Sequence, residues 1–236
     1  MSILLRELMK LSNEEKEIII DKGLEISLGV MLDGALGQIA PGLVAVKSSY
    51  KQLKFEKRIA IALQEMVKRQ EQFELALSKL SHEDITYYEN EIFSHVLDIT
   101  EQETQKEKIK LIINGFETIL ENNILDEDKI FTYYDVLKEL RLMEIRRLFQ
   151  HTSKYLEFKR ANAIKNFRIK LERDEAEVEK QHFENYIDNK LDKLGLIGGG
   201  VRVESEIRDY DGMVTPFGKS FLNFIKFEFA YLNDFN

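Results

Sequence analysis

The sequence contains no cysteine and no tryptophan, and only two of its 236 residues are proline. The absence of cysteine excludes disulfide bridges and thiolate metal sites, and it is compatible with a reducing compartment. The scarcity of proline removes the strongest helix breaker, while Glu, Lys, Leu and Ile are abundant. We therefore expect a mainly α-helical protein built from long helices.

The chain also lacks an excess of positive charge and a recognisable export signal. Its formal net charge is −8 at pH 7, which argues against nucleic-acid binding over the whole surface but not against a local basic patch. The opening residues, MSILLRELMK, do not place a basic region ahead of a long apolar run, as a secretory signal would. We expect a cytoplasmic protein, with membrane association left open by the next segment.

Residues 23–49 are rich in glycine and apolar side chains. Between positions 26 and 46 the only formal charge is that of Asp33, so the stretch is long enough to span a bilayer. That charge and the Pro41-Gly42 pair instead favour a buried helix–turn–helix. The alternative is a membrane-active or close-packing segment, because small residues let helix backbones approach each other. The residues that would shape such a segment are Gly29, Gly34, Gly37 and Pro41.

Apolar residues recur at three- and four-residue steps through the middle of the chain, which is the spacing of amphipathic helices. Ser81 is expected to cap the second of these helices, with Asp84 at its third position. The predicted helices cover residues 51–80, 82–99, 103–122 and 127–141, and a further helix begins near Leu142.

The pattern from about Tyr155 to Leu194 predicts a helix with at most one interruption, which Gly195 ends. Because the apolar face of this helix is narrow, we expect it to be broken or packed against a partner. The firmer part of its inward stripe is predicted to contain Phe183, Tyr186, Ile187, Leu191 and Leu194.

Beyond this helix the pattern indicates two short strands, residues 196–203 and 210–215, that form a hairpin. Thr215 and Pro216 then suit the N-cap and the first position of a last helix. A helix, a hairpin and a helix in this order predict a winged-helix-like unit. The sequence is thus expected to divide into a helical domain, 1–125, and a winged-helix-like domain, 126–236.

Two glycine-bearing stretches resemble nucleotide-binding motifs without meeting their spacing. Gly218-Lys219-Ser220 matches the tail of a phosphate-binding loop, but that loop needs a glycine where Met213 stands. The three glycines of residues 198–200 fall inside the predicted hairpin rather than between a strand and a helix. No histidine lies in a His-Glu-x-x-His pattern and no serine in a nucleophile elbow. We predict no catalytic residue, no metal site and no cofactor, and therefore a non-enzymatic role.

Basic residues are concentrated between positions 146 and 173, where Glu157 and Glu172 are the only carboxylates and aromatic residues are interleaved. This basic stretch could bind phosphates or anionic lipid. It could equally be neutralised by acidic surface on the same protein or on a second copy, which we favour because the rest of the chain is strongly negative. The candidates for anion or nucleic-acid contact are Lys159, Lys165, Arg168 and Lys170.

Two features of the chain resemble a known family. Residues 191–203, LDKLGLIGGGVRV, and 213–225, MVTPFGKSFLNFI, resemble the end of winged-helix domains. A Gly-rich apolar N-terminal segment, a helical middle, an EIRRL helix and that ending stand in an order similar to bacterial abortive-infection proteins of the alpha type, which are often encoded near phage-defence systems. The resemblance implies a cytoplasmic or membrane-proximal defence role and supplies no catalytic residues.

These expectations describe an oligomeric interaction protein in bacterial phage defence that acts through protein contacts, with membrane engagement by residues 23–49 left open. The alternative is a nucleic-acid-binding transcriptional regulator that uses the basic stretch, residues 146–173. The predicted wing weakens this alternative, because its carboxylates would repel DNA phosphates. Those carboxylates belong to Glu204, Glu206, Asp209 and Asp211.

Overall fold

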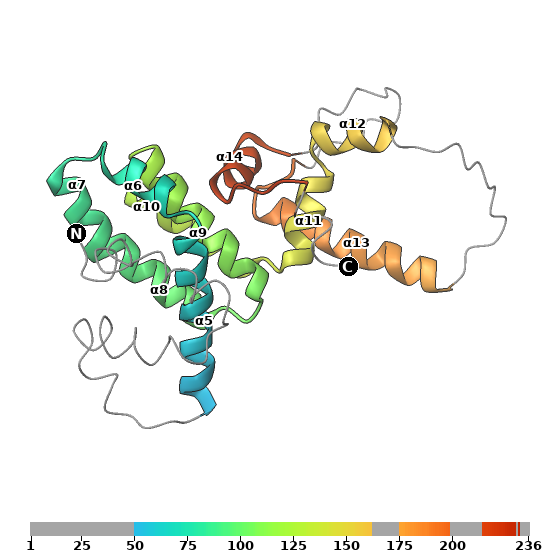
Figure 1. The fold of residues 1–236 in the computed structure, drawn as a ribbon. Helices are drawn as coiled ribbons and strands as arrows, with labels where there is room; N and C mark the ends of the chain where they lie inside the picture. The colour runs from blue at the N-terminus through green and yellow to red at the C-terminus, as the bar shows by residue number, and fades with distance from the viewer. Residues whose placement is uncertain (1–49, 162–174, 199–213, 230, 232–236) are drawn as a thin grey trace. The chain divides into compact units, whose positions relative to one another are not determined.

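The computed structural model describes residues 50–161, 175–198, 214–229 and 231 (Figure 1). The predicted apolar segment, with Gly29, Gly34, Gly37 and Pro41, lies outside the described residues. The same holds for Lys165, Arg168 and Lys170 of the basic stretch, and for the predicted wing between positions 199 and 213.

Helices account for nearly all of the regular structure in the described residues, which confirms the prediction of a mainly α-helical protein. The described part of the chain contains one antiparallel bridge, between Ile197 and Val214, and no longer strand. The helices are α5 (Tyr50–Val67), α6 (Gln70–Leu77), α7 (His82–Tyr87), the π-helix η2 (Tyr88–Ile92), α8 (Phe93–Gln102), α9 (Lys106–Glu121), α10 (Glu127–Glu139), α11 (Leu142–Gln150), α12 (Ser153–Ala161), α13 (Glu175–Lys193) and α14 (Pro216–Phe224).

The chain forms two compact units, Met1–Lys138 and Glu139–Asn236, and each is described by itself. The boundary expected from the sequence, after position 125, precedes α10, whereas this division follows nearly all of it. The hydroxyl of Tyr134 on α10 donates to the carbonyl oxygen of Ile112 on α9 at 3.2 Å. This contact joins α10 to the first unit.

α9 is the central helix of the first unit, because it is buried on nearly every side. Helices α5, α6 and α8 all pack against it. The ring of Phe116 lies 5.9 Å from that of Phe73 and 5.3 Å from that of Phe93, measured between centroids. The predicted helix over residues 103–122 therefore supplies the hydrophobic core onto which its neighbours fold.

The sequence predicts one helix over residues 51–80, and this prediction is wrong, because α5 and α6 are separated by a break at Arg69. The Arg69 guanidinium donates to the carboxylate of Glu117 at 2.9 Å and to the side-chain oxygen of Asn114, both on α9. The carboxylate of Glu65 lies 3.6 Å from the same guanidinium. A charge held by buried partners on another helix outweighs the local preference for a continuous helix.

The start of the next helical segment follows the prediction, and its middle does not. The hydroxyl of Ser81 accepts a hydrogen bond from the amide of Asp84 at 3.0 Å, which confirms the predicted cap. After α7 the chain widens into the π-helix η2, a feature that hydrophobic spacing does not reveal. There the Tyr88 hydroxyl lies 2.8 Å from the side-chain oxygen of Asn123 and 3.0 Å from the carbonyl oxygen of Ile124. These bonds anchor η2 to the loop after α9.

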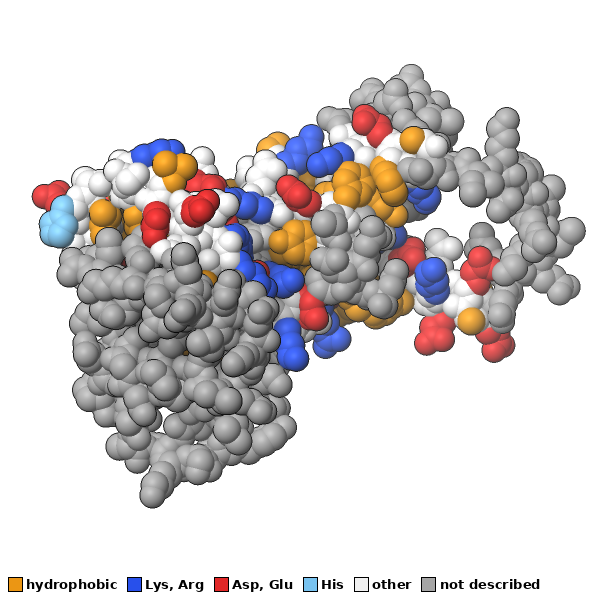
Figure 2. All heavy atoms as spheres, viewed as in Figure 1, with side chains coloured by type: hydrophobic (Ala, Val, Ile, Leu, Met, Phe, Trp, Pro, Cys, Tyr) orange, Lys and Arg blue, Asp and Glu red, His pale blue; other side chains and the backbone are white. Residues whose placement is uncertain are grey.

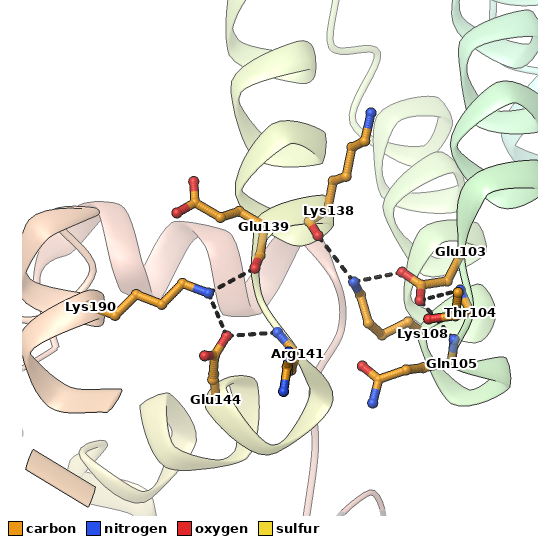
Figure 3. A network of polar contacts seen from close by, with 9 residues as sticks. All are labelled: Glu103, Thr104, Gln105, Lys108, Lys138, Glu139, Arg141, Glu144 and Lys190. Atoms are coloured by element: carbon orange, nitrogen blue, oxygen red, sulfur yellow. Dashed lines mark hydrogen bonds and ion pairs between the residues drawn. The ribbon is translucent and has the colours of Figure 1, made fainter. Parts of the chain in front are cut away.

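A buried ion pair closes the corner between α8 and α9 (Figure 3). One carboxylate oxygen of Glu103 accepts from the amides of Thr104 and Gln105, each at 2.7 Å. Its other oxygen lies 2.6 Å from the ammonium nitrogen of Lys108, which also lies 3.4 Å from the carbonyl oxygen of Lys138. This group provides acceptors for backbone amides just before α9 and links the start of α9 to the end of α10.

The tail of the second unit begins and ends its helices where the sequence indicated. Gly195, with φ of +68°, ends α13 as predicted. Thr215 is the N-cap of α14 and its hydroxyl accepts from the amide of Gly218 at 2.9 Å, with Pro216 at the first helical turn. The amide of Thr215 donates to the carbonyl oxygen of Leu196 at 3.0 Å. The two ends of the predicted hairpin therefore meet.

We expect Gly218→Ala to destabilise the second unit by about 1–3 kcal/mol. A Cβ atom at this position would lie 2.1 Å from the carbonyl oxygen of Leu196 and 2.9 Å from Cγ1 of Val214. Urea unfolding followed by far-ultraviolet circular dichroism measures the change. Ser220→Ala, at an exposed position of the same helix, is the control. Equal urea midpoints for the two variants would show that α14 can move away from Leu196 and Val214 without loss of stability.

His95 on α8 makes the stability of the first unit depend on pH. Its ring lies 4.5 Å from that of Phe131, and its Nε2 is buried without a hydrogen-bond partner among the described residues. Burial lowers the pKa of His95, although Asp135 and Asp98 oppose this effect. The unfolded chain, with the ordinary histidine pKa of 6.5, therefore binds the proton more readily than the folded chain.

We expect the free energy of unfolding of the first unit to be fully retained above pH 6.5 and to decrease as the pH falls below this value. His95→Leu should remove this contribution, because leucine does not titrate and leaves no unpaired nitrogen. Chemical unfolding at a series of pH values measures the slope. His82→Gln, on an exposed residue, is the matched control. Parallel slopes for wild type and His95→Leu would contradict the assignment.

Candidate interaction surface

α13 is held on α11 by a group of charged side chains. Arg147 donates from Nε and Nη2 to the two carboxylate oxygens of Asp188, at 2.8 and 2.7 Å. Its Nη1 donates to Glu184 at 3.2 Å, and Nε2 of His151 lies 2.8 Å from Oδ1 of Asp188. The paired bonds between guanidinium and carboxylate fix both distance and orientation. We call this group the α11–α13 clamp.

The clamp shifts the pKa values of Asp188 and Arg147. Burial of the Asp188 carboxyl would raise its pKa, but hydrogen bonds from Arg147 and His151 outweigh this effect and lower the pKa below 3.8. The pKa of Arg147 is raised, chiefly by its hydrogen bond to Asp188. Asp188 is therefore ionised at neutral pH, and the contribution of the clamp is lost only as the pH falls through the lowered pKa of this carboxyl.

The C-terminal half of α13, residues 184–193, is the docked half. Ile187 and Leu191 are buried there, and they are the buried residues of this helix. Lys190 donates to the carboxylate of Glu144 and to the carbonyl oxygen of Glu139, each at 2.8 Å (Figure 3). The Glu144 carboxylate also accepts from the amide of Arg141 at 2.8 Å, so it connects the start of α11 to α13.

The N-terminal half of α13, residues 175–183, is the projecting half. Every residue in it is exposed, and Figure 1 shows it extending past α11. Val178 is 39% exposed and Phe183 46%, while Tyr186, one turn further on, is 62% exposed. The prediction that Phe183 and Tyr186 point inward is therefore wrong. Their rings instead stack on each other in solvent, with centroids 6.5 Å apart.

Helical geometry places Val178 and Tyr186 away from the face that docks on α11, whereas Phe183, four residues before Ile187, continues the docked face beyond the contact. At 3.6 residues per turn, Val178, His182 and Tyr186 follow one another along one stripe at four-residue steps. Ile187 and Leu191 fall on the opposite side of the same helix. A helix with apolar side chains on two opposite faces has one face left for another contact.

The projecting half is also acidic. It carries Glu175, Glu177 and Glu179, with Lys180 as its one basic residue. Figure 2 shows mostly red side chains around this end of α13, with little blue among them. The apolar stripe is therefore bordered by negative charge, which favours a positively charged partner.

Some side chains of the described part of the basic stretch belong to the clamp, and others are exposed to solvent. Arg147 and His151 are occupied by the clamp. Lys154 and Lys159 on α12 are exposed, and between them lies Phe158, which is 51% exposed. Of the four residues named as anion contacts from the sequence, Lys159 is the one that the structure describes. The site prediction thus stays a prediction, and the rings on α13 were missed because their spacing matches that of core residues.

The described histidines do not form a metal centre. Within the described residues, no three His, Asp or Glu side chains gather in a way that would hold a metal ion. His151 belongs to the clamp, His95 lies against aromatic rings, and His82 and His182 are exposed.

We expect Asp188→Asn to weaken the docking of α13 by about 1–3 kcal/mol, because Arg147 and His151 lose a charged acceptor. Hydrogen exchange of the amides of residues 184–193, read by mass spectrometry at neutral pH, should accelerate by roughly 5- to 150-fold. Glu179→Gln on the projecting half changes the same charge without touching the clamp and is the control. Unchanged exchange in Asp188→Asn would show that apolar contacts alone hold the helix.

None of the described helices combines the length and the apolar character needed to cross a membrane.

Comparison with protein-family models, with curated proteins and with solved structures finds no match for this chain. The resemblance to abortive-infection proteins is therefore carried by the sequence pattern alone, and the surfaces described above are the basis for any functional proposal.

Proposed function

We propose that this chain is a non-enzymatic interaction protein of bacterial phage defence, of the abortive-infection kind, and that the projecting half of α13 is a contact surface. The observation that carries the proposal is the exposed stripe that contains Val178 and Tyr186. Single exposed apolar residues are normal on protein surfaces. Here Val178 and Tyr186 lie on one helix whose other face is already docked, and the ring of Phe183 stacks on that of Tyr186.

The residue types suit protein recognition. Tyrosine is enriched among the residues that dominate binding energy at protein interfaces, because it combines a large apolar ring with a polar hydroxyl. Stacking of Phe183 on Tyr186 holds the rings in place before a partner arrives, which reduces the entropy lost on binding. A rigid helix carrying such rings, bordered by charge, is a common form of helix recognition surface.

The winged-helix-like character of the tail remains part of the proposal. The bridge between Ile197 and Val214 and the Thr215 cap support a hairpin followed by a helix. The loop that would be the wing lies outside the described residues, and its sequence is acidic. An acidic wing favours contact with protein over contact with DNA.

Two further contacts stay within the proposal. Membrane engagement by residues 23–49 rests on the sequence of that segment. The regulator alternative rests on Lys154 and Lys159 on α12, which are exposed beside the ring of Phe158, as in surfaces that bind single-stranded nucleic acid. The acidic character of α13 and of the predicted wing makes this the second choice.

The proposal predicts that the double variant Val178→Lys/Tyr186→Lys loses phage protection while remaining folded. Lysine at both positions removes the apolar stripe that runs from the projecting half to Tyr186, in the first turn of the docked half, and reverses the charge that a basic partner would meet. Plating efficiency of a phage panel on cells that express the wild-type chain, the variant or no chain measures protection. Circular dichroism and hydrogen exchange of the docked half establish that the variant folds.

Leu75→Lys/Leu125→Lys is the matched control, because these leucines are 59% and 50% exposed but lie in the first unit. It should protect like the wild type. A wild-type chain that protects against no phage would overturn the defence role. Full protection by the Val178 and Tyr186 variant would overturn the use of α13.

A further inference from the structure

We propose that the partner of the projecting half of α13 is α12 of a second copy of this chain. This inference rests on the proposed function, because it names the partner of the same surface. The charges and the exposed rings of the second unit identify α12 as the partner.

α12 carries the positive charge that the projecting half lacks, beside an exposed aromatic ring. Its exposed side chains include Lys154, Phe158 and Lys159, and Glu157 is its one carboxylate. Lys154 and Phe158 are four residues apart and therefore share a face. The ring of Phe158 is supported by that of Phe229, with centroids 5.0 Å apart. α12 thus presents the ring of Phe158 on the same face as Lys154, whose ammonium nitrogen lies 5.3 Å from the centroid of the Phe229 ring. Lys159 is exposed next to Phe158 in the sequence.

The two surfaces complement each other in both charge and apolar character. The projecting half offers an apolar stripe bordered by Glu175 and Glu179, and α12 offers an apolar ring bordered by Lys154 and Lys159. Contact would bury the ring of Phe158 against the apolar stripe of α13. At the edge of the interface, the carboxylates of α13 would meet the ammonium groups of α12. Rim charges of this kind set orientation and partner choice.

The α12 of the same copy does not make this contact. Within the second unit, Figure 1 shows α12 and the N-terminal end of α13 well apart. Arg147 and His151 of the basic stretch reach the docked half of the copy's own α13. A second copy is therefore needed to bring Lys154 and Lys159 to Glu175 and Glu179.

Pairing of one α13 with another is disfavoured by the same charges. Two projecting halves in contact would bring the glutamates of one copy close to those of the other, with Lys180 as the one cation on each. Contact between α12 and α13 uses two different surfaces, so two reciprocal contacts produce a two-fold dimer and one contact per pair produces closed rings or open chains. The surfaces are short helices, so association should be weak and should decrease as salt rises.

Charge reversal on each surface provides the test. Lys154→Glu/Lys159→Glu and Glu175→Lys/Glu179→Lys should each be monomeric, because each carries two surfaces of like charge. An equimolar mixture of the two should recover association, since acidic α12 then meets basic α13 and the reverse. Sedimentation velocity of the full chain at low and high salt measures the mass. Lys79→Glu/Lys129→Glu, on exposed lysines of the first unit, controls for net charge and should associate like the wild type.

The absence of cysteine permits a second measurement by cross-linking. Phe158→Cys mixed with Val178→Cys or with Tyr186→Cys should form an intermolecular disulfide under mild oxidation, because facing helices bring Cα atoms within disulfide range. Each variant alone should cross-link several-fold less. A dominant disulfide between two Val178→Cys chains would overturn the proposal in favour of α13–α13 pairing.

Monomeric wild type at every concentration and salt, with no recovery on mixing, would overturn the contact between copies. Salt-sensitive capture of a single-stranded oligonucleotide that Lys154→Glu/Lys159→Glu abolishes, without any change of mass, would overturn it in favour of nucleic-acid binding. These failures are distinct from failure of the proposed function. If the chain is monomeric and the Val178→Lys/Tyr186→Lys variant still loses protection, α13 binds a different protein.

Discussion

The second unit depends on one carboxylate. Asp188 receives two hydrogen bonds from Arg147 and lies against His151, and Lys190 donates to Glu144, so α13 is fixed on α11 at two points. Ile187 and Leu191 bury the adjacent turns, but two apolar side chains alone would allow the helix to slide or rotate. Because the clamp lies near the C-terminal end of a 19-residue helix, the N-terminal turns extend beyond it. The exposed stripe is a consequence of where the clamp sits.

The first unit uses charged side chains in a comparable way. Arg69 breaks a helix to reach Glu117 and Asn114 on α9, and Lys108 joins Glu103 to the end of α10. Each of these side chains is mostly buried and has partners far away in the sequence. A buried charge is tolerated only where hydrogen bonds satisfy it, so such groups restrict how the surrounding helices can be arranged. In a chain without cysteine they provide directional links between helices that apolar packing does not.

The helices of the middle of the chain could be predicted closely, and their side-chain roles less so. The apolar spacing of residues 103–122 and 127–141 located α9 and α10, because amphipathic spacing is a local property. The break at Arg69 could not be predicted, since it depends on partners more than forty residues away. Phe183 and Tyr186 were assigned to the core because their spacing is that of core residues. Which of two apolar faces is buried depends on where a neighbouring helix docks.

The sequence by itself determined the helical class, the caps at Ser81 and Thr215, and the end of α13 at Gly195, because these depend on residues within one turn of each other. It also revealed the contrast between a basic stretch and an acidic chain. Within the described residues, only the tertiary structure decided which basic side chains are paired with carboxylates and which are exposed. Arg147 is neutralised by Asp188, whereas Lys154 and Lys159 stay exposed. Such a difference arises from packing in three dimensions, where residues distant in the chain become neighbours.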